Sequence, residues 1–154
     1  MSKSEAIKIM LLPPTYLFVA IVTVVILHFI CPGIVVVQGL YRLLGLLPMA
    51  IGIALNLTAD RFFKIHQTTV KPFDRSRVMI TEGVFRWSRN PMYLGMVLIL
   101  LGIIILLGSV SPLLVLALFM VLLDVVFIQT EEAKMEHEFG EEFQQYRQQV
   151  RRWI

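Results

Sequence analysis

Charged residues are scarce in this chain. They make up 16% of its 154 residues, whereas about 25% is usual for a soluble domain. Hydrophobic residues make up 57%, which excludes an ordinary soluble domain and indicates an integral membrane protein. At this length we expect a single domain that covers residues 1–154.

Cysteine and histidine are rare as well. The single cysteine, Cys31, cannot form an internal disulfide, and its place at the end of an apolar run is typical of a plain apolar side chain. His28, His66 and His137 lie far apart, without the spacing of metal ligands. We therefore predict no zinc or di-iron site.

Four apolar runs are long enough for transmembrane helices, which need about 20 residues each. Pro13 and Pro14 favour a helix start, and Gly108 and Pro112 favour a tight turn between the last two runs. The runs lack the alternation of membrane strands. The expected fold class is all-α, an integral membrane protein with four transmembrane helices, a cytoplasmic loop and a C-terminal amphipathic helix. The spans cover residues 10–30, 39–59, 92–110 and 111–130, the loop covers 60–91 and the tail covers 131–154.

Lysine and arginine residues gather before the first run, between the second and the third, and after the fourth. The positive-inside rule then predicts that both termini are cytoplasmic, and we expect a prokaryotic inner membrane. No small-residue cleavage site follows the first run, so we expect a retained span rather than a signal peptide. The net charge of +3 suits a surface of anionic lipids and requires no nucleic-acid partner.

The loop and the tail carry local signals of their own. In the loop, Gly83 stands where a turn permits positive φ. Loops of this length are typically functional or disordered, and the many apolar residues of this loop argue against disorder. In the tail, apolar residues recur every three or four positions, which predicts an amphipathic helix with a break at Gly140. Trp153 beside Arg151 and Arg152 is typical of an interfacial anchor, so we expect the tail to fold back along the membrane.

Three carboxylates stand where polarity is costly. Asp124 lies inside an apolar run, where an aspartate costs ~2.5–3.5 kcal/mol on insertion scales. It precedes Glu131 by two helical turns, so both are expected on one face. Asp124 pairs with an arginine (Arg42 or Arg89), is protonated, or contacts a ligand. Glu131 and Glu132 are either solvated or form a site for a cationic, hydroxyl-bearing ligand.

The stretch "RWSRNPMYLG", residues 86–95, places polar residues directly before the third run. Asn90 suits a helix cap, Pro91 suits the first helical turn, and Trp87 and Tyr93 suit a membrane interface. Each residue has a structural explanation when it is taken alone. These explanations do not account for a cluster of such residues on the same membrane face as a glutamate pair.

Two linked motifs resemble a known family. The segments "TEGVFRWSRNPMYLG" and "EEAKMEHEFGEEFQQYRQQVRRWI" resemble the isoprenylcysteine carboxyl methyltransferase and phospholipid methyltransferase family. Its pattern is a glycine, an aromatic residue two positions later, arginine, His-Pro-x-Tyr, a Glu-Glu pair, and Phe-Gly-Glu-Glu-aromatic. The resemblance covers residues 68–153.

This resemblance implies a membrane-embedded enzyme that uses S-adenosylmethionine, bound on the cytoplasmic side beneath the tail helix. The acceptor is expected to be a lipophilic small molecule or lipid delivered from the membrane. Asp124 and Phe127 are the candidate substrate-binding residues, and no catalytic residue or oligomeric state is assigned. The cofactor-binding residues carried over from the family are Arg77, Val78, Met79, Ile80, Phe85, Arg89, Asn90, Pro91, Met92, Tyr93, Glu131 and Glu132.

The chain departs from the family pattern at two positions. Asn90 replaces the histidine, and an amide forms hydrogen bonds but does not titrate, which disfavours a proton shuttle there. Phe127 stands four residues before the first glutamate, where the prenylcysteine branch resembles a pattern with an arginine that reads the substrate carboxylate. A prenylcysteine carboxylate is therefore disfavoured as the acceptor, and the acceptor atom stays open between oxygen, nitrogen and sulfur.

Three functions other than membrane-embedded methyl transfer compare differently with the sequence. A soluble methyltransferase is excluded, because no strand pattern precedes a G-x-G-x-x-G motif. Membrane reductases that use NADPH resemble the Asn/His-Pro-x-Tyr stretch, although their chains are longer and carry more spans. A non-catalytic membrane scaffold is the third possibility.

Overall fold

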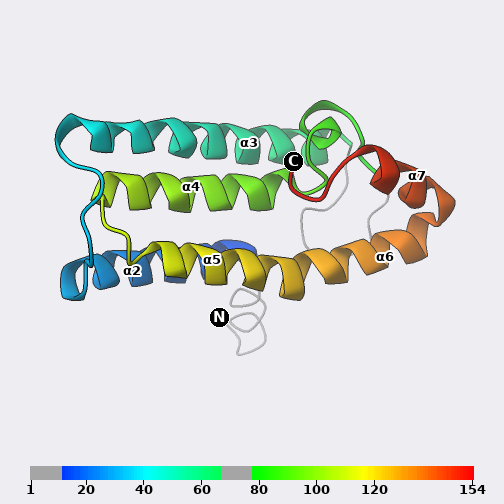
Figure 1. Ribbon diagram of the computed structural model, residues 1–154. Coiled ribbons are helices and arrows are strands. Elements are labelled where there is room, and N and C mark those ends of the chain that lie inside the picture. Colours follow the sequence, from blue (N-terminus) through cyan, green and yellow to red (C-terminus); the bar gives the residue numbers. More distant parts are fainter. Residues whose placement is uncertain (1–11, 67–77) are drawn as a thin grey trace, which may run out of the picture.

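The computed structural model describes residues 12–66 and 78–154, which form a bundle of helices (Figure 1). Arg77 lies outside these described residues. Within them no strand forms beyond an isolated bridge between Val35 and Ser109, so the all-α prediction is confirmed there. The elements are α2 (Pro13–Ile30), η1 (Gly39–Gly45), α3 (Leu46–Ile65), η2 (Gly83–Arg86), α4 (Pro91–Leu107), α5 (Leu113–Leu122), η3 (Leu123–Ile128), α6 (Gln129–Phe139) and α7 (Glu141–Gln149).

Three helical stretches have the length and apolarity of membrane spans, namely Pro13–Ile30, Gly39–Ile65 and Leu113–Phe139. The fourth expected span is α4, which is apolar but has only 17 residues. At 1.5 Å per residue it is about 26 Å long, whereas the hydrocarbon layer is about 30 Å thick. Pro91 occupies its first turn, and Gly108 ends it in a left-handed conformation with φ of 81°. The sequence thus predicts four spans, and three meet the criterion of length.

The helix α4 lies in the middle of the bundle. The long helix α3 packs along one side of it, while α2 and α5 pack on the other (Figure 1). The turn predicted between Gly108 and Pro112 is present, so α4 and α5 form a hairpin. The main core lies between α2, α4 and the helix that begins with α5, where Val24, Leu100 and Leu123 are fully buried.

Paired glycines bring η1 and α3 into close contact with α4. A Cβ atom on Gly52 would lie 2.4 Å from the carbonyl oxygen of Gly95, and one on Gly45 would lie 2.3 Å from that of Gly102. The partner atoms belong to backbone, which cannot move aside as a flexible side chain can. Small residues at such contacts are the usual device for close helix packing in membranes.

Replacing Gly52 with alanine is therefore expected to separate α3 from α4 and to lower the unfolding free energy by about 1–3 kcal/mol. The measurement is the melting temperature of the purified protein in detergent. Ala54→Val is the matched control, because Ala54 lies on the exposed side of the same helix. Equal melting temperatures for the two variants would contradict the close contact.

The helical stretch that begins at Leu113 continues to Phe139, so Glu131 and Glu132 lie within it rather than at the start of a separate helix. The predicted break does occur at Gly140, whose φ of 50° ends the helix before α7. The helix α3 continues to Ile65, into the range 60–91 that the sequence predicts as the loop.

A π-helical turn, η3, interrupts this long helix at Leu123–Ile128. Such a turn closes i→i+5 hydrogen bonds and so inserts an extra residue into the helical phase. The face that carries Asp124 therefore continues with Glu132, and the prediction that Asp124 and Glu131 share a face is wrong. Arg152 shows the shift directly, because its guanidinium contacts both Asp124 and Glu132.

The opposite end of the bundle is held by local polar contacts. His28 Nδ1 lies 2.8 Å from Ser109 Oγ, and Arg42 Nε donates to the carbonyl oxygen of Val37 at 3.1 Å. Arg42 is therefore not the partner of Asp124, as the sequence had suggested it could be.

Candidate functional site

A cavity of about 270 Å³ lies at the end of the bundle where α2 and α4 begin. Most of its lining is apolar, and the carboxylate of Glu131 and the hydroxyl of Tyr93 are among its few polar groups. The lining residues are Leu12, Pro13, Pro14, Phe63, Phe85, Arg89, Asn90, Pro91, Met92, Tyr93, Met96 and Glu131. The structure thus brings together the 85–93 stretch and the first glutamate of the pair, across α4 and the long helix.

The side chains of Tyr93 and Glu131 are joined by a hydrogen bond. The hydroxyl of Tyr93 donates to Glu131 Oε1 at 2.5 Å. Tyr93 is on the first turn of α4, which Pro91 starts, and its ring packs against Phe127 with centroids 6.1 Å apart. This packing and the hydrogen bond fix the Glu131 carboxylate at the cavity wall.

Glu132 has a different environment from Glu131. Its Oε1 accepts a hydrogen bond from Arg89 Nη2 at 2.7 Å, and its Oε2 accepts one from Arg152 Nη2 at 2.7 Å. The side chains of Arg89 and Glu132 are only 8% and 10% exposed. Buried charges need such partners, so Glu132 joins two arginines and does not line the cavity.

Asp124 completes this charge cluster. Arg152 Nη1 donates to its Oδ1 at 3.0 Å, and Gln129 Nε2 donates to its Oδ2 at 3.2 Å. The prediction of an arginine partner is confirmed, but the partner is Arg152 rather than Arg42 or Arg89. Hydrogen bonding to Glu132 raises the pKa of the Arg152 guanidinium above its ordinary value.

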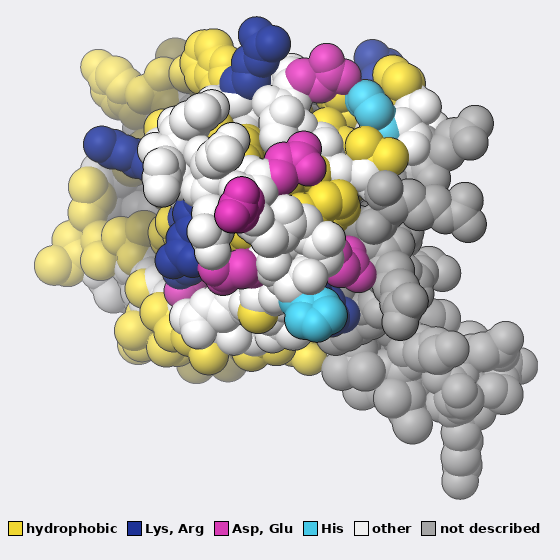
Figure 2. Space-filling model, turned by 90° about the vertical axis from the view of Figure 1, so that its right-hand side faces the viewer, with side chains coloured by type: hydrophobic (Ala, Val, Ile, Leu, Met, Phe, Trp, Pro, Cys, Tyr) yellow, Lys and Arg dark blue, Asp and Glu magenta, His cyan; other side chains and the backbone are white. Residues whose placement is uncertain are grey.

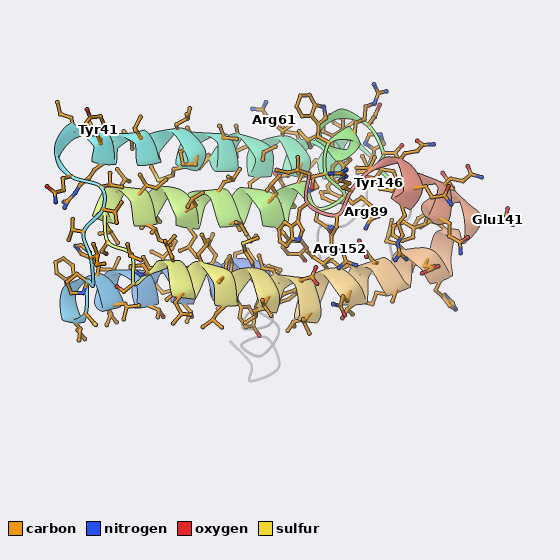
Figure 3. The ribbon with its side chains drawn as sticks, viewed as in Figure 1. Tyr41, Arg61, Arg89, Glu141, Tyr146 and Arg152 are labelled. Atoms are coloured by element: carbon orange, nitrogen blue, oxygen red, sulfur yellow. The ribbon has the colours of Figure 1, made fainter. Side chains whose placement is uncertain are left out.

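The last residues of the chain lie against the start of α4 (Figure 3). We call residues 150–153 the C-terminal strap. Its carbonyl groups accept three hydrogen bonds: Arg89 N to Arg151 O at 3.1 Å, Asn90 Nδ2 to Arg152 O at 3.1 Å, and Ser88 Oγ to Arg152 O at 3.3 Å. Asn90 occupies the N-cap position, but its side chain makes no capping hydrogen bond and binds the strap instead.

The helix α7 lies over the segment that leads to α4. Tyr146 donates its hydroxyl hydrogen to the carbonyl oxygen of Phe85 at 2.6 Å, and Arg89 Nη1 donates to Arg147 O at 3.1 Å. Burial raises the pKa of Tyr146 to about 12, so its hydroxyl stays protonated and donates at neutral pH. The predicted turn at Gly83 is also present, with φ of 61°.

Other residues predicted at the site lie elsewhere. Val78 is exposed, Met79 packs with Phe143 and Tyr146, and Ile80 is buried beside Phe85. Phe127 is buried in the main core. Apart from Phe85, none of these residues lines the cavity, and neither do Asp124 and Glu132.

Some residues of the site were not found from the sequence. Phe63, Met96 and the start of α2 line the cavity, and Arg152 holds the charge cluster. The apolar ones resemble any other residue of a membrane helix, so no signal marks them. The sequence predicts that Arg152 and Trp153 lie at the membrane interface. In the structure Trp153 packs against the main core.

Three comparisons relate the chain to known proteins. A family model described as phospholipid methyltransferase matches residues 40–142. An uncharacterised protein of Haemophilus influenzae is 38% identical over 63 residues, which are 41% of this chain and 100% of that protein. The Protein-S-isoprenylcysteine O-methyltransferase of Schizosaccharomyces pombe is 31% identical over 77 residues, which are 50% of this chain but 33% of that protein. No solved structure matches.

Proposed function

Because the chain belongs to the phospholipid methyltransferase family, we propose that it transfers a methyl group from S-adenosylmethionine to a lipophilic acceptor. Family membership and the isoprenylcysteine methyltransferase relative support methyl transfer to a membrane-associated acceptor. The identity of the methyl donor and the residues that bind it are our proposal. The observation that carries this proposal is the meeting of Tyr93, Asn90 and Glu131 at one cavity.

The cavity residues fit this cofactor chemically. The cofactor carries a sulfonium, an ammonium group and ribose hydroxyls, which favour a carboxylate and aromatic faces. Glu131 supplies the carboxylate, and Phe63 and Phe85 supply the aromatic faces. Arg89 Nε is buried without a hydrogen-bond partner among the described residues, and it lies on a residue that lines the cavity. This donor suits the carboxylate of the cofactor.

The cofactor, when bound, supplies an electrophilic methyl group on its sulfonium. The residues of the chain then bind and orient the two reactants and exclude water from them, which is most of what such a displacement requires. Tyr93 orients Glu131, and the apolar lining from α2 and Met96 keeps water away from the acceptor. Asn90 does not titrate, so no proton passes through it.

The placement in the membrane is also proposed. We infer that α4 crosses the bilayer with the three longer spans, and that the cavity opens near the cytoplasmic face with both termini. Acidic side chains gather at this end, over α6 and α7 (Figure 2). Such a cluster suits water rather than hydrocarbon. One domain of residues 1–154 then holds the whole site.

Ligand-induced stabilisation tests the proposed function. A ligand at 100 times its Kd stabilises the folded state by about 2.7 kcal/mol. S-adenosylhomocysteine is expected to raise the melting temperature of the protein in detergent, and NADPH is expected to leave it unchanged. A shift with NADPH alone would support a membrane reductase, and no shift with either would support a scaffold. Membranes incubated with methyl-labelled S-adenosylmethionine would then identify the acceptor.

A further inference from the structure

We propose that the C-terminal strap positions the wall of the cavity, and that Arg152 is the positioning residue that holds the strap in place. Two residues of the wall, Arg89 and Asn90, are hydrogen-bonded to the strap. The backbone N–H of Arg89 and the side-chain amide of Asn90 both donate to its carbonyl groups. The strap therefore fixes the start of α4 at two residues that line the cavity.

The three hydrogen bonds to the carbonyls of Arg151 and Arg152 would not hold the strap by themselves, because water offers the same groups equivalent partners. The added attachment is the Arg152 guanidinium, which spans two carboxylates of the long helix. It donates to Glu132 Oε2 at 2.7 Å and to Asp124 Oδ1 at 3.0 Å. A planar guanidinium is suited to bridging two acceptors in this way.

The long helix presents both carboxylates on one face, where a single guanidinium contacts them. Asp124 is costly in an apolar run, and the π-helical turn η3 brings it onto the same face as Glu132. Glu132 in turn contacts Arg89, a residue of the cavity wall. The chain of contacts from Asp124 through Arg152 and Glu132 thus ends at the cavity.

This role rests on the proposed function, because the cavity wall matters only if a ligand binds there. A wall held in its binding geometry spares the ligand the entropic cost of ordering it. Release of the strap would free Arg89 and Asn90, and small displacements of positioning groups weaken function strongly. We therefore expect Arg152 to affect ligand affinity without touching the ligand.

The test compares Arg152→Ala with Arg151→Ala in the full chain in detergent. Arg151 is the matched control, because its side chain is exposed and the substitution keeps its backbone carbonyl. Arg152→Ala is expected to speed amide hydrogen exchange in peptides covering residues 85–93 and to weaken S-adenosylhomocysteine binding roughly tenfold. Arg151→Ala should change neither. Arg152→Lys keeps the charge but loses the planar guanidinium that bridges the two carboxylates, so we expect intermediate exchange rates and an intermediate affinity. This variant replaces Arg152→Ala if the alanine protein fails to fold.

Each outcome decides a separate point. Unchanged exchange in Arg152→Ala overturns the holding role of Arg152, and faster exchange with unchanged affinity overturns the positioning role of the strap. Equal effects of the two alanine variants would mean that only the loss of one positive charge matters, which would also overturn the positioning role of Arg152. If the unsubstituted protein binds no S-adenosylhomocysteine, the proposed function fails, while hydrogen exchange still decides whether Arg152 orders the wall.

Discussion

Glu131→Gln is expected to weaken binding of S-adenosylhomocysteine by roughly 10- to 150-fold, because hydrogen bonds to a charged group contribute about 1.5–3 kcal/mol. The substitution keeps the shape of the side chain and an oxygen that accepts from the Tyr93 hydroxyl, while it removes the charge and replaces the second oxygen with an NH2 donor. Since Glu131 lines the cavity and pairs with no cation in the cluster beside it, the melting temperature without ligand is expected to change little. Calorimetry and thermal melts in one detergent measure both quantities.

Glu138→Gln is the control for this prediction. Glu138 lies on the same helix, two turns further on, and is exposed, so the same change in charge should leave the affinity unaltered. A Glu131→Gln protein with normal affinity and a normal melting temperature would remove Glu131 from the binding site. A protein that melts much earlier would instead assign it a structural role.

Local sequence signals were sufficient for most of the helices. Pro13 and Pro91 mark helix starts, and Gly108 and Gly140 mark helix ends, because each restricts or permits backbone angles within its own turn. The stretch that ends with Tyr93 was also placed beside Glu131 from the sequence, through the family motif. Its geometry, with the 2.5 Å hydrogen bond, came only from the structure.

Contacts between distant segments could not be predicted in the same way. The sequence assigned Asp124 and Glu131 to one face because it assumed an uninterrupted α-helix, and η3 changed that phase. The partner of Asp124 is 28 positions away, at the end of the chain, where Arg152 looked like any other interfacial arginine. The sequence explains Asn90 as a helix cap. Its hydrogen bond to the carbonyl oxygen of Arg152 depends on the tertiary fold, which brings the C-terminal strap to the start of α4.

Glu132→Gln is expected to lower the unfolding free energy by roughly 3–5 kcal/mol, since removing one partner of a buried ion pair leaves an uncompensated charge. Glu132 and Arg89 are both almost fully buried, and Glu132 also binds Arg152. A melting temperature about 10 °C lower without ligand is the expected measurement. The neighbouring glutamates thus separate two roles: Glu131→Gln should reduce ligand affinity at normal stability, and Glu132→Gln should reduce stability itself. A Glu132→Gln protein with normal stability would contradict this division, because the buried ion pair with Arg89 would then contribute little to the fold.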